Sequence, residues 1–184
     1  MFRFAKLVQK FFIGLYCKAH HVSYLSTPVF VGRWPIFKNR GRILLGEKCR
    51  FREDRTRHLI SVIAQDAVLE FGTRCFIGDG ANISAAQKIS IGAYTKLAPN
   101  VSIYDTNFHP IQQGEDVFQA EVLIGRNVWI GQNSIILPGV SIGDHSIIGA
   151  NSVVDKNIPA RVVAAGAPAK IVKEIQCIET WIRD

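Results

Sequence analysis

The sequence predicts an all-β fold in which short strands stack into a narrow parallel β-helix, and three observations support this. Apolar residues recur at every sixth position between residues 124 and 154. Glycine follows most of them, and Asn or Asp stands close behind, a composition that favours tight turns between short strands. The fifth position of each hexad is small or apolar, so it can share the interior with the first. Each coil then buries its apolar face only against its neighbours, as in solenoid proteins.

The clearest hexads read IGRNVW, IGQNSI, IGDHSI and IGANSV. Their run has aliphatic first positions, namely Ile124, Ile130, Ile136, Ile142, Ile148 and Val154. Its fifth positions are Val128, Ser134, Val140, Ser146, Ser152 and Ile158. An amphipathic helix would instead need apolar residues spaced by three and four, so the pattern excludes a helix here.

An earlier block of the chain repeats the pattern less regularly. Its apolar positions are Phe71, Ile77, Ile83 and Ile89, followed after an offset by Ile91, Leu97 and Ile103. Cys49 and Cys75 stand at fifth hexad positions, in LGEKCR and FGTRCF. We therefore expect both cysteines to be small interior residues and not nucleophiles.

The hexads stop between residues 104 and 123, where the sequence reads YDTNFHPIQQGEDVFQAEVL. Long polar connections inside a compact domain usually carry function. This segment is predicted to project from the tube and to hold the active site.

The two ends of the chain differ from the coils between them. Residues 1–40 are predicted to form an amphipathic helix and a lead-in segment, residues 41–165 the β-helix, and residues 166–184 a closing segment with a short helix. The first 24 residues mix aromatic and aliphatic side chains with Arg and Lys. Such a helix can lie on an anionic membrane, or it can pack on the β-helix or a neighbouring subunit, and the sequence leaves both placements open.

Composition limits the classes of partner. The net charge of +7 suits an anionic partner, yet no recognisable module of interleaved basic and aromatic residues points to nucleic acid. The four cysteines lie far apart without metal-ligand spacing, so neither a zinc site nor a disulfide framework is expected. No apolar run reaches the length of about 18 residues that a membrane span requires. We expect a cytoplasmic protein, with peripheral contact to the inner face of the membrane if the first helix docks there.

The hexads, a loop containing His-Pro, the sequence VWIG and the sequence AAGAPAKIV together resemble the left-handed β-helix acyltransferases. Among these, the chain looks most like the sugar O-acetyltransferases, such as those acting on galactosides, maltose or surface polysaccharides. The similarity covers roughly residues 41 to 175. It implies left-handed coils, a homotrimer and acetyl-CoA as co-substrate, with no metal required.

The resemblance assigns His109 as the catalytic base, because this residue matches the family's His-Pro motif. Imidazole has an ordinary pKa close enough to neutral to take a proton from a sugar hydroxyl that attacks a thioester. Asp105 and Asn107 lie in the same loop, where they could orient the ring, bind the acceptor or merely cap local turns. His145 falls at a hexad turn and is expected to be solvated.

Alignment to the family also suggests cofactor and acceptor positions. The cofactor candidates are Trp129, Gln132, Ala150, Lys156, Lys170 and Lys173. Asp155 stands where the family usually has a neutral hydroxyl residue. The Asn and Asp that hold the sugar in galactoside enzymes align near Gly78 and Ala86, so galactoside specificity does not transfer. Asp79 and Asn82 are the nearby polar candidates for acceptor binding.

The sequence thus predicts an acetyl-CoA-dependent O-acetyltransferase that acts on a sugar hydroxyl in a surface polysaccharide or its precursor. One alternative is an N-acetyltransferase acting on an amino sugar. The other is a non-catalytic or metal-binding trimeric scaffold, which would need several converging histidines, whereas only His109 stands in a suitable loop.

Overall fold

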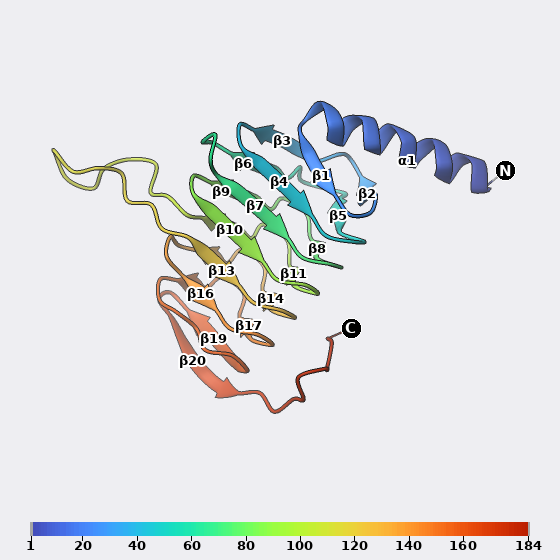
Figure 1. Cartoon of the computed structure of the whole chain (residues 1–184). Helices are drawn as coiled ribbons and strands as arrows, with labels where there is room; N and C mark the ends of the chain where they lie inside the picture. Colours follow the sequence, from blue (N-terminus) through green and yellow to red (C-terminus); the bar gives the residue numbers. More distant parts are fainter. Residues whose placement is uncertain (1, 184) are drawn as a thin grey trace.

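The structure, a computed structural model, describes residues 2–183 and their side chains from residue 7 onward. One helix, α1 (Phe2–Ala19), precedes a parallel β-helix whose coils each contribute one strand to each of three sheets (Figure 1). Within the described residues, no helix is both long and apolar enough to cross a membrane.

The three sheets are named here A, B and C. Sheet A contains β1 (Val22–Tyr24), β4 (Arg42–Leu45), β7 (Val68–Phe71), β10 (Lys88–Ile91), β13 (Val122–Ile124) and β16 (Ser141–Ile142). Sheet B contains β2 (Val29–Gly32), β5 (Arg50–Glu53), β8 (Phe76–Ile77), β11 (Lys96–Leu97), β14 (Trp129–Ile130), β17 (Ile147–Ile148), β19 (Val162–Gly166) and β20 (Ala169–Glu174). Sheet C contains β3 (Ile36–Asn39), β6 (Leu59–Val62), β9 (Asn82–Ala85), β12 (Ser102–Tyr104), β15 (Ile135–Ile136) and β18 (Val153–Val154). All pairs are parallel except β19 with β20.

The interior is built as the hexads predict. First positions stack in register, for example Leu97 on Ile130 and Ile130 on Ile148, and all of those in the clear run are buried. The fifth positions of that run are buried as well. Their serine hydroxyls donate to corner carbonyls, as Ser134 Oγ does to the Gly149 oxygen at 2.8 Å. A buried hydroxyl with such a partner costs little, which explains why serine and aliphatic residues share this position inside the tube.

Cys49 and Cys75 take the same interior position in earlier coils. Both are buried, and their thiols approach the carbonyl oxygens of Gly72 and Gly92 at 3.2 Å. The expectation that they are interior residues is confirmed.

Glycine at the second hexad position permits close stacking at the corner between sheets A and B. A Cβ on Gly92 would lie 2.5 Å from the carbonyl group of Gly125 in the next coil. Two residues after such a glycine the backbone turns with a positive φ, which is 55° at Asn127 and 62° at His145. Asparagine tolerates this left-handed region better than most residues, which accounts for its frequency in the hexads.

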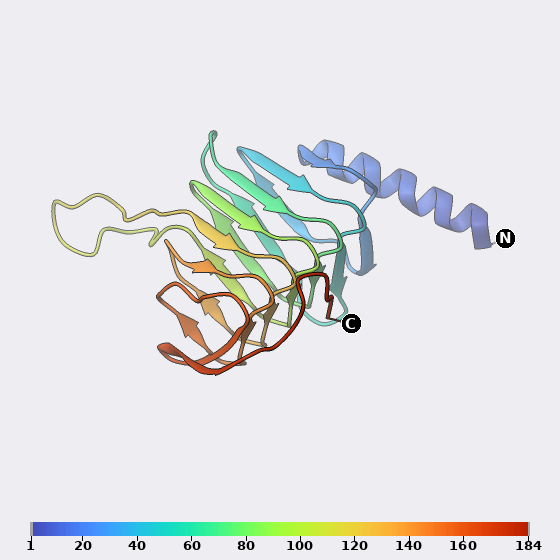
Figure 2. The ribbon, with the colours of Figure 1, turned by 60° about the horizontal axis from the view of Figure 1, so that its bottom comes forward.

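The two ends of the fold differ in part from the expectation. Regular coils begin at Val22, inside the predicted lead-in segment, and α1 packs against the first coil through Ile13 and Cys17. The prediction of a short C-terminal helix is wrong. β20 forms an antiparallel hairpin with β19, and residues 175–183, here called the C-terminal tail, run without a helix along the corner between sheets A and B (Figure 2).

The C-terminal tail also overturns the expectation for His145, which is fully buried and not solvated. The ring of Trp181 stacks over the imidazole at 6.4 Å between ring centroids, and Asn127 Nδ2 lies 2.9 Å from His145 Nδ1. Arg183 donates to the backbone oxygens of Asn127 and His145 at 2.7 and 3.1 Å.

Candidate active site

The polar loop of residues 104–123 projects far from the β-helix in both views (Figures 1 and 2). It leaves sheet C after β12 and returns to sheet A at β13. The projection that the sequence predicts for this segment is therefore present.

Asp105 clamps the base of the loop. Its buried carboxylate accepts hydrogen bonds from the backbone N–H groups of Ala86 at 2.6 Å and Gln87 at 2.8 Å. Its own carbonyl oxygen accepts from Ala120 N–H at 2.9 Å, so the outgoing and returning limbs meet at this point. Burial raises the pKa of the Asp105 carboxyl, although the backbone N–H groups oppose that shift.

His109 is exposed to solvent on the outgoing limb of the loop, two residues beyond Asn107, whose N–H donates to the Phe118 oxygen of the returning limb. The preceding residue, Phe108, has a φ of 63° and packs edge-on against Tyr104 at 5.5 Å between ring centroids. Among the described residues, no hydrogen bond or ion pair holds the imidazole. Asp105 is occupied at the loop base, so within one chain it does not orient the ring of His109.

Two hollows flank the loop. One, of about 650 Å³, lies between the loop and the turns that follow β15 and β18, and it brings Asn107 beside Phe118 and Asp155. The other, of about 610 Å³, lies on sheet C and is bordered by Lys38, Asn39, Arg40, Leu59, Ser61, Val62, Ile63, Ser84 and Phe108. The hydroxyls of Ser61 and Ser84 lie 2.5 Å apart in this second hollow. Both hollows beside the loop therefore combine polar and apolar side chains.

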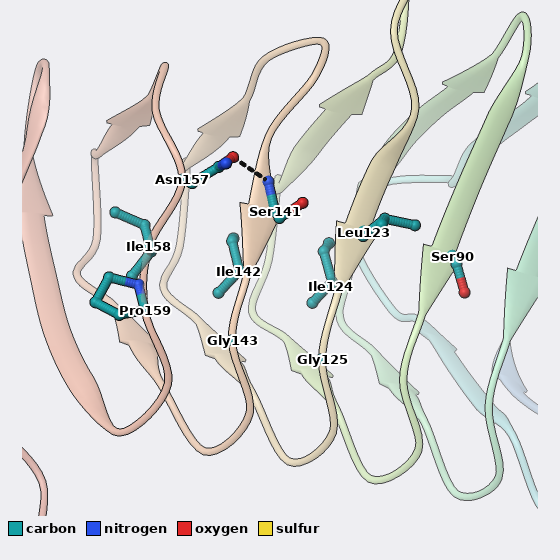
Figure 3. A pocket seen from close by; sticks show the side chains of 10 residues that line it. All are labelled: Ser90, Leu123, Ile124, Gly125, Ser141, Ile142, Gly143, Asn157, Ile158 and Pro159. Atoms are coloured by element: carbon teal, nitrogen blue, oxygen red, sulfur yellow. Dashed lines mark hydrogen bonds between the residues drawn. The ribbon is translucent and has the colours of Figure 1, made fainter.

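A third hollow, of about 470 Å³, lies on the outer face of sheet A (Figure 3). Aliphatic residues, glycines, serines and a proline line it, together with Asn157, whose side-chain oxygen accepts from Ser141 N–H at 2.8 Å. No side chain in this lining can act as an acid or base near neutral pH. This hollow is not apparent from the sequence, because Ser90, Leu123 and Ser141 become one column only through strand register.

The cofactor candidates fall into separate groups. Gln132 and Ala150 occupy successive corners between sheets B and C, where Asn151 N–H donates to the Gln132 carbonyl at 2.8 Å. Trp129 points outward from sheet B and is 44% exposed. Lys170 and Lys173 lie on β20 at the end of that sheet, whereas Lys156 follows β18 at a different corner. A single chain does not gather them around His109.

Known proteins share both the sequence and the fold of this chain. The family model described as bacterial transferase hexapeptide (six repeats) matches residues 121–156. Galactoside O-acetyltransferase of Escherichia coli (strain K12) is 34% identical over an alignment of 139 positions, and the match covers 67% of this chain and 68% of that protein. The chain belongs to the hexapeptide-repeat acyltransferase family.

Solved structures agree with this membership. A maltose O-acetyltransferase from Clostridium difficile 630 is 31% identical with a TM-score of 0.56, covering 86% of this chain and 72% of that one. A galactoside acetyltransferase in complex with coenzyme A is 27% identical with a TM-score of 0.57, covering 84% and 66%. The predicted left-handed parallel β-helix and the predicted enzyme class, an acetyl-CoA-dependent O-acetyltransferase, are confirmed.

The two acceptor candidates of this hexapeptide-repeat acyltransferase stand apart from the loop. Asp79 accepts hydrogen bonds from the backbone N–H groups of Asp54 at 2.5 Å and Arg55 at 3.0 Å, so it caps a turn between coils. Asn82 begins β9 and is partly exposed. Neither residue borders the two hollows beside the loop.

Glu53 and His58 form a buried pair that is not apparent from the sequence. Glu53 Oε1 accepts from His58 N–H at 2.9 Å, and His58 Nδ1 accepts from Ala81 N–H at 3.1 Å. Burial lowers the pKa of His58 to about 4 and raises the pKa of Glu53. No hexad pattern marks either residue, because they face each other across a turn. Within residues 2–183, no group of three His, Cys, Asp or Glu residues is arranged to hold a metal ion.

Proposed function

We propose that this acyltransferase moves the acetyl group of acetyl-CoA to a hydroxyl of a sugar, with His109 as general base. One observation carries the proposal: the loop is anchored at its base by Asp105 and leaves His109 exposed to solvent, and no side chain in the described part of the chain is bonded to its imidazole. The names of the relatives support a sugar acceptor.

The chemistry needs one proton transfer and no covalent enzyme intermediate. The imidazole takes the hydroxyl proton while the sugar oxygen bonds to the thioester carbonyl carbon. The carbonyl oxygen gains negative charge, which a backbone N–H donor stabilises. The carbon–sulfur bond then breaks, the proton passes to the departing thiolate, and the products are the acetyl ester and free coenzyme A.

A second copy of the chain is proposed to complete the site. The loop that carries His109 leaves the β-helix at the corner between sheets C and A. Trp129 lies on sheet B, and Gln132 and Ala150 lie at the corner between sheets B and C. A loop reaching across sheet B of a neighbour would bring these groups together, and a ring of three copies would repeat the contact. The exposed Lys156, together with the two lysines of β20, would meet coenzyme A phosphates as point charges.

The test is acetyl transfer by His109→Ala at saturating acetyl-CoA, measured as thiol release with a panel of free, nucleotide-linked and lipid-linked sugars. We expect turnover to fall by about 10² to 10⁴ while coenzyme A binding is retained. His21→Ala removes another exposed histidine and serves as the matched control. Turnover equal to that of the unaltered enzyme would remove His109 from the mechanism. Alkali-labile product indicates an ester, whereas stable product indicates an amide and would replace O-acetylation by N-acetylation.

The shared site has its own test. Mixed assemblies of His109→Ala and Trp129→Ala chains contain some interfaces where both residues are intact. We expect these mixtures to be more active than either parent variant. Activity no higher than that of the parents, in assemblies shown to be mixed, would place both residues in one chain's site.

A further inference from the structure

The helix α1 has two apolar faces, and only one of them is covered. The inner face packs on the first coil through Ile13 and Cys17, while Tyr16 lies edge-on to Trp34 at 5.0 Å between ring centroids. The outer face exposes large apolar side chains, with Leu7 at 66%, Phe11 at 68%, Phe12 at 51%, Leu15 at 55% and Val8 at 37%. Their spacing of four residues puts them on one side of the helix.

The positive charge of the protein is concentrated in the same region. The first 46 residues contain eight Lys and Arg residues and no Asp or Glu. The remaining 138 residues contain 14 basic and 15 acidic residues, so the whole excess of +7 arises in the segment that begins with α1. Lys10 and Lys18 are exposed on the helix itself.

The position of α1 at one end of the molecule leaves its outer face accessible to a large flat surface. It covers the N-terminal end of the β-helix and extends beyond the body on the side opposite the loop (Figures 1 and 2). The outer face is thus uncovered by the described chain. Contact of two α1 helices through these faces would bring two cationic segments together, which like-charge repulsion disfavours.

We infer that α1 docks the protein on a membrane surface rich in anionic lipid. The outer apolar face enters the boundary between headgroups and acyl chains, with the helix parallel to the surface. The basic residues lie among the anionic headgroups, where each contributes about fivefold to binding. This inference does not depend on the proposed reaction, because it concerns a different face of the molecule.

The test uses the full chain and vesicles of phosphatidylcholine alone or mixed with phosphatidylglycerol, separated by flotation. We expect binding to the mixed vesicles that weakens with added salt, and little binding to the neutral ones. The double variant Phe11→Gln with Leu15→Gln should lose at least about tenfold in affinity. Lys10→Gln with Lys18→Gln should lose about 25-fold on mixed vesicles at low salt, as two such contributions predict.

Controls separate docking from general exposure and from self-association. Leu25→Gln with Ile178→Gln removes two aliphatic residues that are 78% and 72% exposed elsewhere, and vesicle binding should be unchanged. Sedimentation should give the same mass for the helix variant Phe11→Gln with Leu15→Gln as for the unaltered chain. Vesicle binding that survives this variant, or a chain that never binds anionic vesicles, would overturn the inference. A lower sedimenting mass of the variant without loss of vesicle binding would assign the face to a second copy instead.

Discussion

Replacing Asp105 with alanine tests what holds the loop of residues 104–123 in place. The change removes the acceptor for two backbone N–H groups, those of Ala86 and Gln87. The Ala86 N–H is buried and would stay unsatisfied, which costs about 1–3 kcal/mol, whereas water can reach the partly exposed bond at Gln87. Part of this loss is offset because the buried carboxylate is itself costly to desolvate, as its raised pKa indicates. We expect the free energy of unfolding to fall by about 2 kcal/mol.

Urea unfolding measures that loss, and hydrogen exchange at Ala86 locates it. Asp105→Asn keeps one acceptor oxygen and should lose about half as much stability. Asp116→Ala changes an exposed aspartate of the same loop, so it should be neutral. The rate of acetyl transfer should fall in Asp105→Ala, because the start of the loop is no longer held to Ala86 and Gln87.

The opposite pattern would refute this reasoning. If Asp105→Ala lowers turnover while the unfolding free energy and the exchange at Ala86 stay unchanged, the carboxylate acts on the imidazole of a neighbouring chain. The loop would then owe its position to other contacts, such as the bridge between Thr106 and Gln119.

Three further outcomes follow from the fold and the proposed site. Burial lowers the pKa of His58 to about 4, so the unfolded chain takes up the proton first, and stability should decrease by about 3 kcal/mol as pH falls from about 6.5 to 4. Urea unfolding across that range should show a flatter profile for His58→Gln. Gly92→Ala puts a Cβ against the backbone of Gly125 and should cost about 1–3 kcal/mol, measured by urea unfolding. Lys156→Gln with Lys173→Gln should weaken coenzyme A binding in calorimetry, more strongly at low salt.

Each of these has a contrary result. A pH profile that His58→Gln leaves unchanged would assign the acid sensitivity to other groups. An alanine at residue 92 that leaves unfolding unchanged would mean that the coils separate easily at that corner. If the affinity for coenzyme A is unchanged when both lysines are replaced, the cofactor is bound by backbone groups and not by these side chains.

The sequence predicts the stacked interior because the hexad period determines which residues lie above one another in successive coils. A residue at one hexad position meets its equivalent in the next coil, so Ile130 and Ile148 are paired once the period is known. The loop is equally visible, because it interrupts that period. The hydrogen bonds that anchor Asp105 cannot be seen in the sequence, because the partner N–H of Ala86 lies 19 residues away and no pattern links the two residues.

Contacts between distant segments explain the errors as well. His145 stands in a turn that would be solvated if the chain ended with the coils, but Trp181 covers it. The residues after Lys173 have a composition that suits a helix, yet Ile175 N–H donates to the Arg161 carbonyl at 2.7 Å, and the chain continues along the corner. Tertiary contacts thus override local preference at this end of the molecule.

The C-terminal tail changes how the β-helix can come apart. A stack whose coils contact only their neighbours can fray one coil at a time from an exposed end. Here Arg161 Nη2 contacts Glu179 at 2.5 Å, and further along the tail Arg183 N–H donates to Asn127 Oδ1 at 2.9 Å, two coils away. The last coil therefore cannot open without also breaking contacts in the coil that contains Asn127, so the C-terminal coils should exchange their amide hydrogens as one cooperative unit.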